Sequence, residues 1–276
     1  MTDPVTAVVL GIIEGITEFL PVSSTGHLLI AQQWLPRQTD LFNVVIQTGA
    51  VLAVIPLFHK RFHQFIFNYR DPAVFDYFLK IVVAFVITGA GGFIMEKKGF
   101  KLPEKLFPIA VALLVGGVIF LVVEGWLKKS GHGAGQDKER GDTRSVTWTV
   151  AIAVGIGQLI AAGFPGASRS GTTIIFALLL GLTRPLATEY SFLVSIPTML
   201  AAGGYKIFKS VHHPEAGAPH ENWQMVILST VIAAVVSFVA VKWLLRYVQT
   251  HTFVLFGWYR VLVGGALLVA VLMKWV

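Results

Sequence analysis

Apolar runs recur along almost the whole of this chain, and their length limits its fold more than any other feature does. A helix needs roughly 20 apolar residues to cross the hydrocarbon core of a bilayer. Hydrophobic residues make up 55% of the 276 residues and charged residues only 13%, whereas about a quarter of the residues of a soluble domain are charged. The sequence therefore predicts an all-α polytopic membrane protein.

Six runs are long enough to be transmembrane helices. They cover residues 41–58, 75–95, 106–127, 186–208, 224–246 and 253–275, and Pro197 and Gly203-Gly204 interrupt the fourth of them. Two other regions each contain a pair of shorter apolar segments. The pairs are 4–20 and 22–35 around Pro21, and 146–164 and 167–182 around Pro165-Gly166. Because non-helical backbone is tolerated at membrane depth only where protein or a water-filled cavity satisfies it, these pairs predict re-entrant helical hairpins.

A hydrophilic stretch at 128–145 predicts a loop and divides the chain almost in half. Shifting the sequence by 144 residues aligns the two halves at both hairpin breaks. The identical pairs are Gly11 with Gly155, Ile12 with Ile156, Ile16 with Ile160, Pro21 with Pro165 and Ser24 with Ser168, and Glu14 meets its near-isostere Gln158. Since three spans follow each hairpin, the second half enters from the opposite face, which predicts an inverted-topology repeat. Its units would be repeat 1 at about 4–127 and repeat 2 at about 146–276, within a single membrane domain 1–276. Two independent proline kinks in an ordinary bundle are the alternative.

The first hairpin carries the stretch EGITEFLPVSSTGH, which begins at Glu14 and interrupts an apolar run with acids and hydroxyls. Glu14 and Glu18 are four residues apart and therefore share one helix face. Carboxylates inside a membrane are costly and repel each other, so we expect a metal ion, an arginine or a shared proton beside them. A surface-facing turn near the membrane interface is the alternative. Ser23, Ser24 and Thr25 follow the break, where the free N–H groups of a helix N-terminus form an anion site.

The second hairpin carries the stretch PGASRSGTT, which begins at Pro165 and surrounds a single arginine with hydroxyls. Arginine presents a fixed fork of donors that matches phosphate oxygens, and it stays charged when buried. The pattern therefore indicates a phosphate-binding turn, although serine, threonine and glycine also serve plain helix packing in membranes. Its candidate phosphate-binding residues are Gly166, Ser168, Arg169, Ser170, Thr172 and Thr173.

His27 lies in an apolar segment within one helical turn of Ser24 and Thr25, which makes it a candidate for proton transfer. Glu189 and Arg260 also fall inside spans, where each could line the site or form a structural or interfacial contact. The chain has no cysteine, which excludes a disulfide, a thiolate nucleophile and a cysteine-ligated metal. The net charge of +7 suits loops that face anionic lipid, and without a soluble basic domain nucleic acid is not expected as a partner.

At these two motifs the sequence resembles the undecaprenyl-diphosphate phosphatases of the bacitracin-resistance family, and hydropathy follows that family over essentially the whole chain. The family's glutamate-rich motif falls on Glu14 and Glu18, its serine and histidine fall on Ser24 and His27, and its PGxSRSxxT motif begins at Pro165. The resemblance implies a bacterial inner-membrane enzyme that removes the terminal phosphate of undecaprenyl diphosphate. It thereby implies recycling of the lipid carrier for peptidoglycan precursors, and bacitracin resistance. It also implies the inverted repeat, a homodimer and a divalent cation, Mg²⁺ or Ca²⁺.

Several mechanisms are compatible with these residues. Arg169 and the helix N-termini would stabilise the transferring phosphoryl group. Glu14 and Glu18 would hold the cation, or one of them would act as a base. Ser24 is the candidate nucleophile with His27 as its proton partner, while attack by His27 itself or by a metal-activated water stays open.

Two other classes of protein share some of these features. A transporter or lipid flippase would explain an inverted repeat equally well. Another class of membrane lipid phosphatases has similar short motifs but needs a second catalytic histidine after the arginine, and no intramembrane histidine follows Arg169 here. The distribution of lysine and arginine favours, by a thin margin, both termini outside the cell, so the first hairpin would open toward the periplasm.

Overall fold

Every regular element of the computed structural model is helical within the residues that it describes, which are 3–99, 105–130, 146–212 and 221–275. The elements are α1 (Pro4–Thr17), α2 (Ser24–Ala31), α3 (Asp40–Val54), the 3₁₀ helix η1 (Ile55–Phe58), α4 (His59–Phe67), α5 (Pro72–Lys97), α6 (Leu106–Lys129), α7 (Trp148–Gly163), α8 (Arg169–Leu179), α9 (Arg184–His212), α10 (Trp223–Tyr247) and α11 (Val254–Leu272). The predicted all-α class is therefore confirmed.

Six helical segments are long and apolar enough to cross a membrane, and each contains most of one predicted span. Many of their outward-facing side chains are apolar: Val122, Val239 and Leu262 are 64%, 61% and 68% exposed. Apolar side chains exposed on this scale mark a surface that contacts something other than water. Together, the lengths of these segments and their apolar outer faces make the chain a multi-pass membrane protein.

The predicted loop at 128–145 begins later than expected. Lys128 and Lys129 form the last turn of α6, where cations interact favourably with the carbonyl end of a helix. The positions 131–145 lie outside the described residues.

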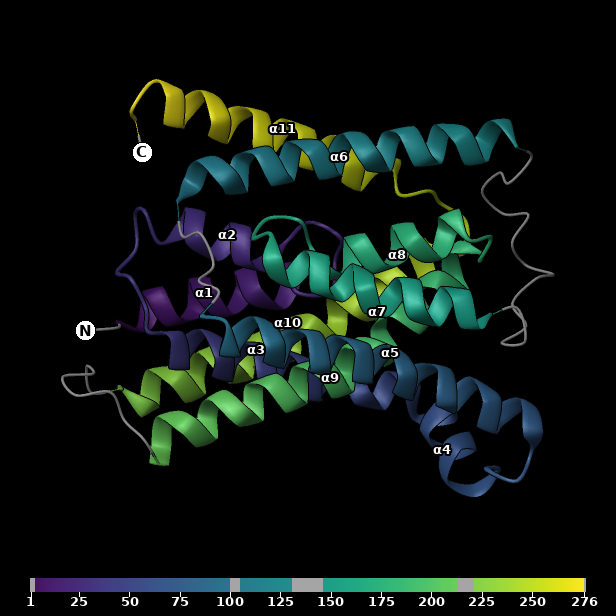
Figure 1. Cartoon of the computed structure of the whole chain (residues 1–276). Coiled ribbons are helices and arrows are strands. Elements are labelled where there is room, and N and C mark those ends of the chain that lie inside the picture. Colours follow the sequence, from purple (N-terminus) through teal and green to yellow (C-terminus); the bar gives the residue numbers. More distant parts are fainter. Residues whose placement is uncertain (1–2, 100–104, 131–145, 213–220, 276) are drawn as a thin grey trace.

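Four short helices lie between two groups of long ones (Figure 1). α6 and α11 form one outer layer, and α3, α5, α9 and α10 lie on the opposite side. Between them, α1 and α2 occupy the left half of the view and α7 and α8 occupy the right half. α1 packs mainly on α10, whereas α7 packs on α5 and on α8. The short helices thus lie between the long ones, and polar groups near their facing ends, such as Glu14, Glu18 and Ser24, are buried.

The outer layer is held together by a close approach of α6 and α11. A Cβ atom added at Gly117 would lie 2.7 Å from the carbonyl oxygen of Gly257, and one added at Gly264 would lie 2.6 Å from the backbone nitrogen of Leu114. Small residues at such positions let two backbones meet, which is a common basis of helix packing in membranes.

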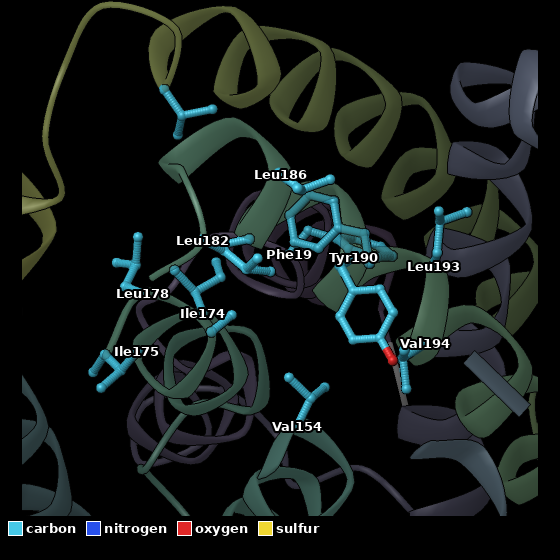
Figure 2. Close-up of a cluster of buried hydrophobic side chains, with 14 of the residues drawn as sticks. Phe19, Val154, Ile174, Ile175, Leu178, Leu182, Leu186, Tyr190, Leu193 and Val194 are labelled. Atoms are coloured by element: carbon cyan, nitrogen blue, oxygen red, sulfur yellow. The ribbon is translucent and has the colours of Figure 1, made fainter. Parts of the chain in front are cut away.

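The largest buried apolar cluster includes the turn between the two helices of the first hairpin (Figure 2). Phe19 follows α1 and lies among side chains of α8 and α9, including Ile174, Leu186 and Tyr190. Its ring also packs edge-on against Phe192 of α9, with 5.1 Å between the ring centroids. Burial of an aromatic ring is worth on the order of 2 kcal/mol or more, so Phe19 anchors the first hairpin to the second half of the chain.

Candidate active site

Each pair of short helices is joined by a turn that ends at a serine with positive φ. Ser23 has φ 75° and its hydroxyl accepts a hydrogen bond from the N–H of Gly26, and Ser168 has φ 68° and accepts one from Gly171. Positive φ is uncommon for a residue with a side chain and marks local backbone strain. Both serines satisfy the first turn of the helix that follows, as N-cap residues do.

The two capping serines show that the sequence alignment with a shift of 144 residues is off by one residue after the breaks. The shift of 144 residues pairs Ser24 with Ser168, whereas the structure gives the same capping role to Ser23 and Ser168. Ser24 and Arg169 are consequently the first helical residues of α2 and α8. The cap follows the proline of the break by two residues in the first hairpin, from Pro21 to Ser23, and by three in the second, from Pro165 to Ser168. A single fixed shift cannot represent both.

Glu18 lies at the centre of the cluster formed by the two hairpins. One of its carboxylate oxygens, Oε1, accepts a charge-assisted hydrogen bond from Nη2 of Arg169. The other, Oε2, accepts from the hydroxyl of Ser24 at 2.5 Å and from the amide of Gln47 at 3.1 Å. Glu18 is only 5% exposed, so these donors compensate the burial of its charge. The structure therefore supplies an arginine beside the predicted carboxylates and brings Ser24 and Arg169 to the same group.

Glu14 differs from Glu18 in having no donor. It is 1% exposed, and neither of its carboxylate oxygens has a hydrogen-bond partner in the described residues. A buried polar group without a partner is rare in proteins and calls for an explanation such as an ion or a catalytic role. Glu14 therefore remains available to a ligand, whereas Glu18 is held by the protein.

His27 lies beside the cluster, and its ring nitrogens bond to groups other than the hydroxyl of Ser24. Its Nδ1 is 2.7 Å from the carbonyl oxygen of Ser23 and its Nε2 is 2.7 Å from the hydroxyl of Tyr259. Because a carbonyl oxygen can only accept, Nδ1 carries a hydrogen, and in the neutral ring Nε2 accepts from the hydroxyl of Tyr259. The two rings stack at 5.6 Å between centroids with 9° between their planes. The predicted pairing of Ser24 with His27 is replaced in this arrangement by Ser24 with Glu18.

The remaining hydroxyls of the second hairpin are mostly used by the backbone. Thr172 donates to the carbonyl oxygen of the cap Ser168, and Thr173 donates to that of Arg169. Ser170 donates to the carbonyl of Leu20 at 3.1 Å. Thr25 of the first hairpin is exposed. Among the predicted phosphate-binding side chains, Arg169 is thus the one placed directly on the acidic cluster.

The two polar residues that the sequence left unassigned have different environments. Glu189 is paired with Arg61 at 2.5 Å and belongs to that structural contact. Arg260 is completely buried and donates to the carbonyl oxygens of Pro21 and Gly166, one from each hairpin turn. Sequence reasoning missed Gln47 and Tyr259, because nothing in their local sequence indicates which carboxylate or ring they reach.

Divalent cations such as Mg²⁺ and Ca²⁺ take oxygen ligands, which carboxylates can supply. In the described ranges, no group of three or more His, Asp or Glu residues could hold a metal ion. Mg²⁺, however, is often bound by one or two carboxylates together with waters and substrate phosphates. The two partnerless oxygens of Glu14 match that mode, and Glu18 is one helical turn away. The residues therefore fit a cation that is shared with a bound phosphate.

The fold and the cluster define a multi-pass membrane protein in which two short helical hairpins bring Arg169, Glu18 and Ser24 together. Residues 7–266 match the family described as bacitracin resistance protein BacA, and the chain belongs to this family. It is 49% identical over 269 residues to the undecaprenyl-diphosphatase of Xanthomonas euvesicatoria pv. vesicatoria, covering 97% of both chains. It is 46% identical over 267 residues to the undecaprenyl-diphosphatase of Rhizobium etli, covering 96% of both chains. The resemblance found from the two motifs is therefore confirmed.

Proposed function

We propose that this chain hydrolyses undecaprenyl diphosphate to undecaprenyl phosphate and inorganic phosphate. The observation that carries the proposal is the buried cluster in which Ser24 donates to Glu18 at 2.5 Å while Arg169 binds the other oxygen of the same carboxylate. A hydroxyl, a base and a phosphate-binding cation meet there between two hairpins. The names of the relatives support the substrate, and the conclusion implies recycling of a cell-wall lipid carrier and bacitracin resistance.

Substrate binding would exchange the partner of Arg169. In the described structure its guanidinium is bound to Glu18, and a diphosphate entering between the hairpins offers the same fork a second acceptor with more charge. The guanidinium of Arg169 makes the Glu18 carboxylate a weaker base while the two are paired. When Arg169 turns to the terminal phosphate, Glu18 therefore becomes a stronger base. Binding of the substrate would thus prepare the carboxylate for proton transfer.

The hydroxyl of Ser24 would then attack the terminal phosphorus while Oε2 of Glu18 takes its proton. The bond between that phosphorus and the bridging oxygen breaks, and undecaprenyl phosphate leaves. Water hydrolyses the phosphoserine, which releases inorganic phosphate and restores the serine. Arg169 stabilises the charge on the equatorial oxygens, which is the main requirement of phosphoryl transfer.

His27 would give a proton to the leaving group or take one from the attacking water. The donor at Tyr259 and the acceptor at Ser23 fix its ring orientation and its tautomer. Direct attack by His27 or by water are the rival mechanisms, and both predict that Ser24→Ala keeps substantial turnover.

We also propose a divalent cation, Mg²⁺ or Ca²⁺, held by Glu14 with Glu18 nearby and with oxygens of the diphosphate. When bound, such a cation neutralises charge on the phosphates and makes the terminal phosphorus easier to attack. The support is the pair of buried Glu14 oxygens that no described residue satisfies.

The same proposal includes an inverted repeat with two re-entrant hairpins in one membrane domain, 1–276. A two-fold axis that exchanges the halves would relate α1 to α7, α5 to α10 and α6 to α11. The packing of α1 on α10 and of α7 on α5, together with the pairing of α6 with α11, supports this symmetry. The interruption of both hairpins at a capped serine supports it as well.

We propose the inner membrane as the location, with the first hairpin opening toward the periplasm, and a homodimer as the assembly. Because the chain has no cysteine, single cysteines can report the orientation. Gln38→Cys lies between α2 and α3, and Asn68→Cys lies between α4 and α5. In intact cells an impermeant maleimide should label the first and reach the second only after lysis; the reverse pattern would invert the proposed orientation.

The activity is tested with purified protein in detergent and a C15 or C55 prenyl diphosphate. We expect phosphate release that requires a divalent cation and that Ser24→Ala abolishes. Parent protein that releases no phosphate with any cation, but moves lipid across liposomes, would instead identify a transporter or flippase.

A further inference from the structure

Arg260 is the bulkiest fully buried side chain in the described part of the molecule. It lies in α11, inside a candidate membrane span. A buried guanidinium is normally paired with a carboxylate, because an unpaired charge is costly to remove from water. In the described ranges no acidic side chain forms an ion pair with Arg260, and its partners are backbone carbonyl oxygens. The bonds run from Nη1 to Pro21 at 3.2 Å, from Nη2 to Gly166 at 3.1 Å and to Ala112 at 3.2 Å, and from Nε to Leu113 at 3.4 Å.

Two of these carbonyls belong to the breaks of the two hairpins. Pro21 precedes the cap of α2, and Gly166 precedes the cap of α8. Carbonyls in such turns have no helical N–H to bind, and membrane depth offers little water. A single guanidinium therefore satisfies both breaks and connects them to α6, through Ala112 and Leu113.

The space around Arg260 is provided by glycines on two different helices. A Cβ atom at Gly116 of α6 would lie 2.0 Å from Nη2, and one at Gly171 of α8 would lie 3.1 Å from Nη1. The first approach is far too short for a Cβ atom, and the second is tighter than most real Cβ contacts. The position of the guanidinium is thus fixed by its acceptors and also by the shape of its surroundings.

We propose that Arg260 is a positioning residue that sets the separation of the two hairpins. Ser24 and Glu18 come from the first hairpin and Arg169 from the second, so their contact depends on that separation. Lysine keeps the charge of arginine but lacks the planar fork that reaches several acceptors at once. The inference rests on the proposed function for its kinetic readout, while a second readout is independent of activity.

The activity-independent readout is cross-linking between the hairpins. The hydroxyl of Ser170 lies 3.1 Å from the carbonyl of Leu20, and the chain contains no cysteine of its own. In the double variant Leu20→Cys with Ser170→Cys, a short bifunctional maleimide should join the two thiols. Adding Arg260→Lys should slow that reaction several-fold, although the thermal unfolding midpoint still shows folded protein.

The kinetic readout uses otherwise unchanged protein. Arg260→Lys should lower kcat per folded molecule by roughly tenfold or more with little change in KM, because misplacement by about 1 Å can cost 100-fold in rate. Gly116→Ala keeps Arg260 but fills the space of Nη2, so it should lower kcat in the same way. Gly125→Ala is the control in the same helix, since an added Cβ there meets no atom within 4 Å.

A double-mutant cycle separates positioning from general stability. If Arg260 acts by placing Arg169, then Arg260→Lys should cost much less in a chain that already carries Arg169→Lys. If Arg260→Lys and Arg169→Lys lower kcat independently, so that their effects multiply in the double variant, the inference is overturned. It is also overturned if Arg260→Lys leaves both the cross-linking rate and kcat unchanged. Parent protein without phosphatase activity would reject the proposed function, and the cross-linking rates would still decide the role of Arg260.

Discussion

The two hairpins have the same backbone plan but opposite chemistry. Both end their first helix at a break and begin the second with a serine cap at positive φ. The first hairpin carries Glu14 and Glu18, and the second carries Arg169. A shared plan places two helix N-termini in the interior, and the side chains differ in charge: the first hairpin supplies carboxylates and the second supplies an arginine.

The contrast is sharpest at Glu14 and Gln158, which occupy matching positions and are each 1% exposed. The amide of Gln158 donates to the hydroxyl of Thr88 at 3.1 Å, whereas both oxygens of Glu14 lack a partner. A neutral amide can be buried at modest cost, but a carboxylate at that depth is expensive. The chain carries the costly group in the first hairpin only, which is the difference that the proposed role of Glu14 as a ligand requires.

Substitution of Arg169 should have the largest effect. Arg169→Lys keeps the charge but loses the bidentate fork, so kcat/KM should fall on the order of 100-fold, as when one stabilising donor is removed from a transition state. Phosphate release from a prenyl diphosphate measures the loss, and the unfolding midpoint should stay close to that of the parent. Near-normal turnover would make Arg169 a structural partner of Glu18 and remove the chemical distinction between the hairpins.

Glu14→Gln gives the first hairpin the residue that the second hairpin has at the matching position, Gln158. Activity should fall roughly 10- to 100-fold, the range seen when groups that support a metal site are removed, and the dependence on divalent cation should weaken. Because the change relieves a buried carboxylate, the variant should unfold at the same temperature as the parent or higher. A variant that keeps both activity and its cation requirement would exclude Glu14 as a ligand.

Tyr259→Phe removes one hydrogen bond from His27 and leaves the stacked ring in place. A single hydrogen bond contributes about 0.5–1.5 kcal/mol, so kcat should fall by about 2- to 10-fold. Steady-state kinetics on the prenyl diphosphate measures this change. Tyr205→Phe is the matched control, because Tyr205 is exposed and its hydroxyl lies 3.4 Å from Glu96. Equal rates for both variants would remove His27 and Tyr259 from the mechanism.

The smallest effect is expected at the counterpart of Glu14. Gln158→Leu has a similar volume and removes an amide oxygen that has no partner in the described residues. Thr88 still donates to the carbonyl of Ala84 at 2.9 Å, so both stability and turnover should remain near the parent values. Large loss of activity in folded protein would show that the second hairpin contributes more than Arg169 and its capped turn.

Much of the architecture could be predicted because it depends on local patterns. Segment length and apolarity define a membrane span directly, and all six predicted spans correspond to helical segments of the required length. Proline and serine mark the hairpin breaks through their own backbone preferences. The register beyond the breaks was wrong by one residue, since an insertion in a turn leaves no trace in a fixed shift.

The sequence by itself determined the membrane class, the two interrupted segments and the residue types of the candidate site. Only the tertiary structure decided the partners: Ser24 with Glu18, His27 with Tyr259, and Arg260 with both hairpin turns. Hydrophobicity and turn preference act within a few neighbouring residues, so they can be read along the chain. A hydrogen bond between residues more than 200 positions apart, as between His27 and Tyr259, depends on how the helices pack, and that is fixed only when the whole chain has folded.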